Sequence, residues 1–223
     1  MDFSLAAMAL GAAGVIYGAI LAFAQTDFKR LVAYSSVSHM GFVVLGVYAW
    51  NELALQGAVM QMVAHGFSTA ALFMVAGALQ ERLHTRDMRE MGGLWQQMPR
   101  MGAVTMFFVV ASLGLPGLGN FVAEFLVLLG LFQINPWMTV AAAMGLIVGA
   151  IYSLILMQRS FHGEFNAKLK GHSLVDFAGR EMLTMAVMMA ALIGLGLYPQ
   201  PVLDIAQPVL HSLLELTAVE VTP

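Results

Sequence analysis

Six long stretches of apolar residues constrain this chain more than any other feature of its sequence. In a window of about 19 residues they fall at 4–25, 31–50, 54–80, 102–133, 137–158 and 182–200. At about 1.5 Å per residue, each is long enough to cross the roughly 30 Å hydrocarbon core of a bilayer as an α-helix. Only 10% of the 223 residues are charged, whereas soluble domains have about 25%. The sequence therefore predicts an all-α, polytopic membrane helix bundle with six transmembrane helices.

The fourth stretch, 102–133, is too long for a simple crossing and is interrupted near its middle. Gly114 and Pro116 both disfavour a continuous helix there, because glycine adopts unusual dihedrals and proline lacks a backbone N–H. We therefore expect two half-helices, one before residue 114 and one after residue 120, joined by irregular backbone. Such backbone survives at membrane depth only where protein buries it or water reaches it, and broken helices mark ion sites in transporters.

The basic residues predict how the bundle is oriented. All ten lie in alternate connectors: Lys29 and Arg30; Arg82, Arg86, Arg89 and Arg100; and Arg159, Lys168, Lys170 and Arg180. By the positive-inside rule these connectors are cytoplasmic, so both termini lie on the outer side. The residues expected to act as topology anchors at the interface are Lys29, Arg30, Arg82, Arg86 and Arg89.

Three ionisable residues are predicted near the middle of the bilayer, each on a different helix. Counting the helix rise from the nearest connector places His39, His65 and Glu124 roughly 15–16 Å deep. Glu124 is the only acidic residue within the six apolar stretches. An ionisable group at this depth costs at least about 2.5–3.5 kcal/mol and is a functional candidate by default. Because the three share a depth, we expect Glu124, His39 and His65 to form a proton relay parallel to the membrane plane.

Further residues are expected to support this relay with freed backbone groups, hydroxyls and an amide. They are Gly114, Pro116, Gly117, Gly119, Asn120, Ser112, Tyr34 and Ser38. A purely structural alternative stays open for each relay residue. Either histidine can serve only as a hydrogen-bond partner of a neighbouring helix, and Glu124 can be a neutral carboxyl bonded to the open backbone of the break.

The remaining polar features predict little chemistry. We expect His84, His162, His172 and His211 to be solvated, and the mildly amphipathic segment 201–218 to form an interfacial helix on the outer side. The chain has no cysteine, which excludes disulfides and thiolate-held iron–sulfur clusters within it. A net charge of −3 gives no indication of nucleic-acid binding. We predict no metal site, and lipid and protons as partners.

Four blocks of sequence, taken in order, resemble the antiporter-like proton-translocating subunits of NADH-quinone oxidoreductase, respiratory complex I. They are AQTDFKRLVAYSSVSHMGF (24–42), GAVMQMVAHGFSTAALFMVAGAL (57–79), ERLHTRDMREMGGLW (81–95) and GLPGLGNFVAEF (114–125). The resemblance covers nearly the whole chain and is closest to the subunit M, or chain 4, branch of that family.

The resemblance implies a specific architecture. Subunits of that family have fourteen helices, with two inverted five-helix repeats that each contain a broken helix. Residues 1–158 correspond to the second repeat, 159–180 to a cytoplasmic loop, and 181–223 to the final helix and an outer tail. The first repeat has no counterpart, so we expect a fragment or a split gene product. The sequence leaves open whether the native protein extends upstream of Met1 and whether this half conducts protons alone.

The resemblance also implies residue roles and an activity. Glu124 matches the carboxylate of the broken helix, and His39 and His65 match histidines on the two preceding helices of the polar axis. The chain is then a translocase subunit in the membrane arm of complex I, relaying protons coupled to quinone reduction in a bacterial inner membrane. It would bind no cofactor itself, with NADH, FMN, iron–sulfur clusters and quinone held by partner subunits. Neighbouring antiporter-like subunits and other membrane-arm subunits are the implied partners.

Two alternative functions share this fold. One is a subunit of a multisubunit cation/proton antiporter or of a membrane-bound hydrogenase, and the other is a truncated scaffold that conducts nothing. The HTRDMREMGGLW block and a glutamate rather than a lysine at position 124 favour complex I.

Overall fold

The computed structural model describes residues 2–169, 171 and 174–219, so Lys170 and His172 lie outside the described residues. The described part of the chain is built of helices, with no strand beyond an isolated bridge between Asp27 and Asp87. The elements are α1 (Asp2–Phe23), α2 (Phe28–Tyr48), α3 (Glu52–Leu83), α4 (Leu94–Gln97), α5 (Pro99–Ser112), α6 (Gly119–Ile134), α7 (Pro136–Ser160), η1 (Ala167–Leu169), α8 (Gly179–Leu197) and α9 (Gln200–Val219).

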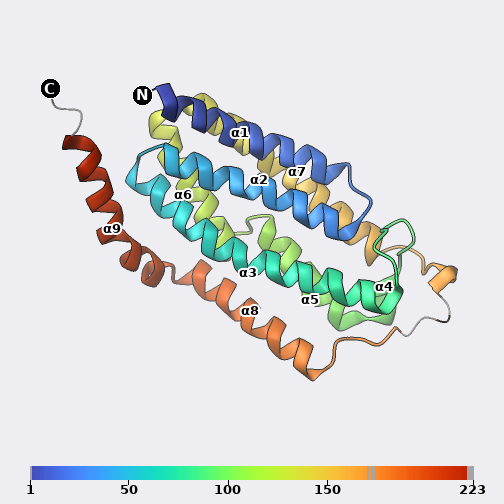
Figure 1. The fold of residues 1–223 in the computed structure, drawn as a ribbon. Helices are drawn as coiled ribbons and strands as arrows, with labels where there is room; N and C mark the ends of the chain where they lie inside the picture. The colour runs from blue at the N-terminus through green and yellow to red at the C-terminus, as the bar shows by residue number, and fades with distance from the viewer. Residues whose placement is uncertain (1, 170, 172–173, 220–223) are drawn as a thin grey trace.

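The structure confirms the predicted bundle and its broken fourth helix. Among the described residues, five helices (α1, α2, α3, α7 and α8) are long and apolar enough to cross a membrane. The shorter apolar helices α5 and α6 together make the sixth crossing (Figure 1). The predicted stretch 102–133 therefore becomes two half-helices, separated by residues 113–118.

Short polar side chains fix where several helices begin. Asp27 caps α2 by accepting a hydrogen bond from the backbone N–H of Arg30, and Asn135 does the same for Met138 in α7. Helix α5 differs, because its cap comes from a distant part of the chain. The Asp176 carboxylate accepts from the backbone N–H groups of Arg100 and Met101 at 2.8 and 2.9 Å. These acceptors satisfy donors that the first turn of a helix leaves unpaired.

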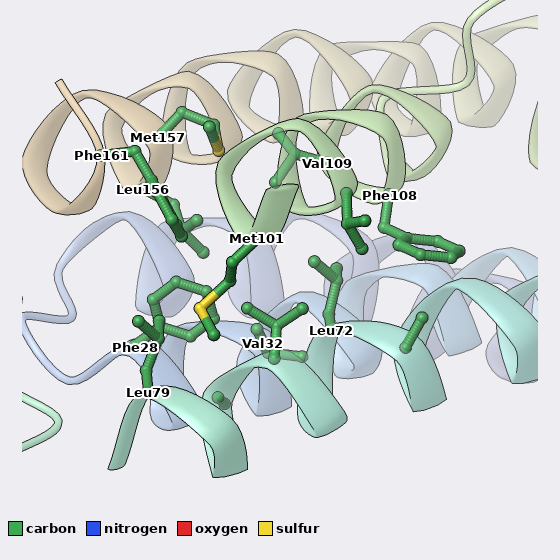
Figure 2. Close-up of a cluster of buried hydrophobic side chains, with 14 of the residues drawn as sticks. Phe28, Val32, Leu72, Leu79, Met101, Phe108, Val109, Leu156, Met157 and Phe161 are labelled. Atoms are coloured by element: carbon green, nitrogen blue, oxygen red, sulfur yellow. The ribbon is translucent and has the colours of Figure 1, made fainter. Parts of the chain in front are cut away.

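Two apolar clusters fill the interior, one toward each end of the bundle. The larger one includes Phe28, Leu79, Met101 and Phe161 and lies toward the end with the basic connectors (Figure 2). The smaller one, toward the other end, is made of residues such as Phe42 and other buried side chains of α1, α2, α6 and α7. The polar residues at the middle of the helices therefore lie between two apolar regions.

The five predicted topology anchors lie at one end of the bundle, which we call the basic end. Lys29 and Arg30 begin α2, while Arg82, Arg86 and Arg89 end or follow α3, which runs antiparallel to α2. Three of them are ion-paired: Arg82 with Glu181 at 2.8 Å, Arg86 with Asp27 at 3.2 Å, and Arg89 with Asp87. Which side of the membrane the basic end faces stays a prediction.

The tail forms a helix, as expected, and it contacts the end opposite the basic one. Helix α9 contains Pro208 and diverges from the bundle beyond α8 (Figure 1). His211 lies 3.2 Å from Glu52 at the start of α3. His84, His162 and His211 are all exposed, as the sequence predicts. The interfacial location of α9 stays a prediction.

Candidate functional site

The structure brings the three predicted relay residues together in the middle of the bundle. Glu124, His39 and His65 are only 3%, 4% and 7% exposed. His39 Nδ1 lies 3.0 Å from Glu124 Oε1, and the rings of His39 and His65 are 5.0 Å apart between centroids. They come from α6, α2 and α3, so the site exists only where these three helices pack against one another. Their role as a proton relay stays a prediction.

A fourth residue, Gln61, belongs to the same group and was missed from the sequence. Its amide Nε2 lies 3.5 Å from Glu124 Oε1, and its side chain is fully buried. Gln61 precedes His65 by four residues, so both lie on one face of α3. That spacing was the available signal, but an uncharged amide does not stand out in a search for ionisable groups.

The break between α5 and α6 is shaped to receive the Glu124 carboxylate. Gly114 has φ +70°, in the left-handed region, and a β-carbon placed on it would lie 2.6 Å from Glu124 Oε2. The carboxylate therefore occupies the space that any other residue at position 114 would need. Gly117 also has positive φ, at +97°, and Pro116 lies between the two glycines. The break thus has a direct structural connection to the buried acid.

Two neighbouring helices, α3 and α8, pack closely against part of the break. A β-carbon on Gly196 of α8 would overlap the carbonyl group of Gly117. A β-carbon on Gly119 would lie 2.9 Å from the β-carbon of Leu195 in α8 and 3.1 Å from that of Ala64 in α3. Protein therefore contacts the break at Gly117 and Gly119, whereas Leu115 and Pro116 are exposed. Irregular backbone at membrane depth requires either cover by protein or access to water.

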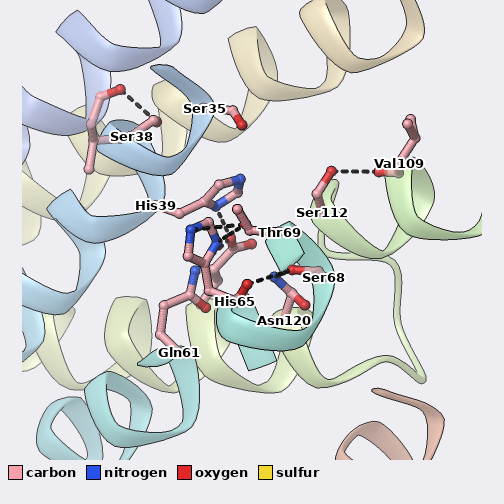
Figure 3. A network of polar contacts seen from close by, with 12 residues as sticks. Ser35, Ser38, His39, Gln61, His65, Ser68, Thr69, Val109, Ser112 and Asn120 are labelled. Atoms are coloured by element: carbon pink, nitrogen blue, oxygen red, sulfur yellow. Dashed lines mark hydrogen bonds and ion pairs between the residues drawn. The ribbon is translucent and has the colours of Figure 1, made fainter. Parts of the chain in front are cut away.

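A second polar chain connects the start of α6 to His65 (Figure 3). Asn120 Nδ2 donates to Ser68 Oγ at 3.2 Å, and the Ser68 hydroxyl donates to the His65 carbonyl at 3.3 Å. Thr69 Oγ1 lies 3.1 Å from His65 Nε2. Asn120 was predicted as a supporting residue, whereas Ser68 and Thr69 were not singled out.

Three of the predicted supporting side chains have other partners in the structure. The Ser112 hydroxyl donates to the Val109 carbonyl in its own helix, and the Ser38 hydroxyl donates to the Val15 carbonyl of α1. Tyr34 packs against the larger apolar cluster. These contacts stabilise a helix end and the packing between helices. They do not connect the three side chains to Glu124 or the histidines.

Several buried polar atoms around Glu124 have no protein partner within the described residues. They are His39 Nε2, Gln61 Oε1 and Asn120 Oδ1. Buried polar groups in proteins are almost always satisfied, by protein or by water. These atoms are therefore available to hydrogen-bond to a further group beside the carboxyl and the two imidazoles.

Comparisons with known proteins agree with this architecture. Residues 2–151 match the transmembrane family of NADH:quinone oxidoreductases and Mrp antiporters. The chain is 52% identical, over 95% of its length, to NADH-quinone oxidoreductase subunit M of Pseudomonas aeruginosa, and 50% identical, over 91%, to that of Escherichia coli. It covers 41% and 40% of those two proteins, so it spans about two fifths of the length of the curated relatives it matches.

Solved structures show the same arrangement of helices. A chain of respiratory complex I from Thermus thermophilus superposes with a TM-score of 0.89 at 33% identity, covering 96% of this chain and 45% of that one. A chain of the Mrp complex from Dietzia superposes with a TM-score of 0.84, covering 96% of this chain and 48% of that one. The latter is only 17% identical, so it is informative about the fold alone.

Proposed function

Since the chain belongs to the NADH:quinone oxidoreductase/Mrp antiporter transmembrane family, we propose that it is a proton-translocating membrane-arm subunit of an NADH-quinone oxidoreductase. In this proposal Glu124, His39 and His65 pass protons along a polar axis near the bilayer midplane. Quinone reduction elsewhere in the complex drives the transfer. Residues 1–158 form the antiporter-like repeat, and 181–223 add the final helix and tail.

The contact between His39 and Glu124 is the observation that carries this proposal. An imidazole and a carboxylate 3.0 Å apart can share and exchange a proton without moving the helices that hold them. Both side chains can accept and release a proton, which a purely structural hydrogen bond does not require. The adjoining His65 ring and His39 Nε2, which has no partner within the described part of the chain, are further sites that can take the proton.

The same proposal implies where the cofactors are held, which subunits are neighbours and which membrane contains the chain. The relatives at 50–52% identity are named as subunits of NADH-quinone oxidoreductase. We assign NADH, FMN, iron–sulfur clusters and quinone to partner subunits. For the clusters this agrees with the sequence, which has no cysteine to hold one. Its neighbours are then other membrane-arm subunits, antiporter-like ones among them, in a bacterial inner membrane with the basic end in the cytoplasm.

A subunit of a cation/proton antiporter is the second candidate. The fold shared with the Mrp complex favours it, but at 17% identity this likeness extends only to the fold. The higher identity to quinone oxidoreductase subunits favours the first candidate.

Replacing Glu124 by Gln tests the proposal. The amide keeps the size of the side chain but cannot take up and release a proton in the same way. In the isolated complex reconstituted into liposomes, we expect proton pumping per NADH oxidised to fall severely while assembly is retained. Glu215→Gln is the matched control, since Glu215 is exposed on α9. Unchanged pumping by the Glu124 variant would rule out the relay and favour a scaffold.

A further inference from the structure

The three helices that hold the relay residues pack very closely between Glu124 and the end of the bundle opposite the basic end, which we call the far end. Gly57 of α3 faces α6, and a β-carbon there would lie 2.6 Å from the backbone nitrogen of Val127. Gly130 of α6 faces α3, and a β-carbon there would lie 2.5 Å from the backbone nitrogen of Ala54. The two backbones are therefore in direct contact, with no room between them for even a methyl group.

Helix α2 closes the third side of this contact. A β-carbon on Gly46 would lie 2.6 Å from the carbonyl oxygen of Ala54 and 3.2 Å from a methyl carbon of Val127. Gly46, Gly57 and Gly130 thus bring α2, α3 and α6 together around two alkyl side chains that are fully buried. We call these three glycines, with Ala54 and Val127, the glycine contact. It begins about one helical turn beyond the buried acid, toward the far end.

The interior around the glycine contact is apolar. Phe42 and Leu131 belong to the same buried apolar cluster as its two alkyl side chains. The backbone N–H and C=O groups of these helices bond within their own helices. From Glu124 to Leu131 this apolar region extends over seven residues of α6, or about 10 Å. Asn51 and Gln133, which bond to each other at 2.9 Å, lie beyond it at the far end.

Buried polar side chains are distributed unevenly on the two sides of the site. Within the described part of the chain, none lies between Gln61 and the far end. Those that lie nearer the basic end than Glu124 include Ser35, Ser68, Thr105, Ser153 and Ser160. Glu124 and Gln61 therefore mark the limit of the buried polar side chains in the direction of the far end.

A proton moves through a protein along polar side chains or water, because an isolated charge in an apolar interior is very unfavourable. We propose that the glycine contact is a proton barrier, which prevents exchange of protons between Glu124 and the far end. This inference rests on the function proposed above and gives the relay a direction. Protons reach and leave Glu124 through the midplane axis and the basic half of the bundle. With the basic end in the cytoplasm, this half releases no protons directly to the outer side.

Close packing also has a simpler role, from which a barrier can be distinguished. Small residues let helices approach and pack within membranes. If that is their whole role here, loosening the glycine contact lowers thermal stability without making the complex permeable to protons. If the contact is a barrier, loosening it admits protons from the far end, and these protons then pass through Glu124.

The experiment measures passive proton leak through the intact complex in liposomes, without NADH. A pH gradient is imposed in the presence of valinomycin and potassium, and an enclosed pH-sensitive dye reports the leak. We expect Gly57→Ala to raise the leak by about tenfold, because the strain of overpacking shifts an opening equilibrium by such a factor. Gly77→Ala, also on α3, is the matched control, since no atom lies within 4 Å of its β-carbon position. Its leak should equal that of the unmodified complex, and adding Glu124→Gln to Gly57→Ala should abolish the increase.

A second variant tests the barrier without forcing the helices apart. Val127→Thr combined with Leu131→Asn replaces two buried apolar side chains by polar ones of similar size. This variant should leak as Gly57→Ala does, and again only when Glu124 is present.

The outcomes separate this inference from the relay. If neither variant leaks more in a fully assembled complex, while Glu124→Gln loses pumping, the barrier is wrong and the relay stands. An increased leak that persists after Glu124→Gln would also overturn the barrier, because the protons would bypass the site. Normal pumping in Glu124→Gln would instead overturn the proposed function.

Discussion

Glu124 is held in place by contacts from three separate segments of the chain. Its Oε1 faces His39 Nδ1 at 3.0 Å and Gln61 Nε2 at 3.5 Å, while its Oε2 fills the space beside Gly114. A buried carboxylate needs such partners, because an unpaired charge in a low-dielectric interior costs several kcal/mol. The position of the acid is therefore sensitive to small changes in any of these three neighbours.

Gly114→Ala is the sharpest test of that sensitivity. Alanine in a left-handed conformation costs roughly 1–2 kcal/mol, and its β-carbon would displace the Glu124 carboxylate from 2.6 Å away. We expect lower thermal stability together with a large loss of pumping per NADH, although Glu124 itself is unchanged.

Gly117→Ala is the matched control for this prediction. Gly117 also has positive φ, at +97°, but no neighbouring atom lies within 4 Å of its β-carbon position. It should share the backbone strain and keep most of the pumping. Equal pumping in the two variants would show that position 114 does not place the acid.

Residue depth could be read from the sequence, but the direction of each side chain could not. Helix rise alone placed Glu124, His39 and His65 at one level, and the structure brings them together. Ser112 and Tyr34, predicted as supporting residues for their hydroxyls, have other partners in the structure, and Gln61 was missed. Which face of a helix meets which neighbour depends on packing between helices, and this cannot be derived from one sequence without their relative rotations.

At the scale of helices, the break was predictable while the elements that support it were not. Glycine and proline in 114–119 act locally, so they indicate where α5 ends and α6 begins. The cap on α5 comes from Asp176, more than seventy residues away, and α8 covers the break through Gly196. Both are contacts between distant parts of the chain, and nothing in the local sequence of 99–134 specifies them.

Gly196→Ala tests how closely α8 must approach the break. The added methyl group would overlap the Gly117 carbonyl, so α8 or the break has to shift, at a cost of about 1–3 kcal/mol as in other overpacked cores. We expect a lower midpoint of thermal denaturation of the detergent-solubilised complex, and weaker pumping.

Gly194→Ala, two residues earlier in α8, should behave oppositely. No atom lies within 4 Å of its β-carbon position, and alanine favours helix over glycine by about 0.5–1 kcal/mol. A similar loss of stability in both variants would mean that the close contact at Gly196 is unimportant.

At the scale of the whole molecule, the two ends of the bundle differ in charge. All the described basic residues lie at or near the basic end, where ion pairs connect α3 to α8 and the segment after α3 to the cap of α2. At the other end, His211 Nε2 lies 3.2 Å from Glu52 Oε1, a contact that joins α3 to α9. This asymmetry predicts a single orientation in the membrane.

Cysteine labelling tests the orientation directly, because the chain has no cysteine of its own. Glu164→Cys lies on an exposed connector at the basic end, and Asp204→Cys lies on exposed α9 at the other end. An impermeant maleimide should label Asp204→Cys in right-side-out cells and Glu164→Cys only in inverted vesicles. The reverse pattern would contradict the predicted topology, and labelling of both from one side would contradict the number of crossings.

Helix α8 connects the break to the outer surface of the molecule. One of its faces rests on the bare main chain at Gly117, and only Tyr198 and Pro199 separate its last residue from α9. Because α8 packs directly against the backbone at Gly117, a change in the shape of the break would shift α8. We therefore expect a rearrangement of residues 113–118 to shift α8 and, through it, α9. A conformational change beside Glu124 would then alter the position of α9 at the end of the bundle.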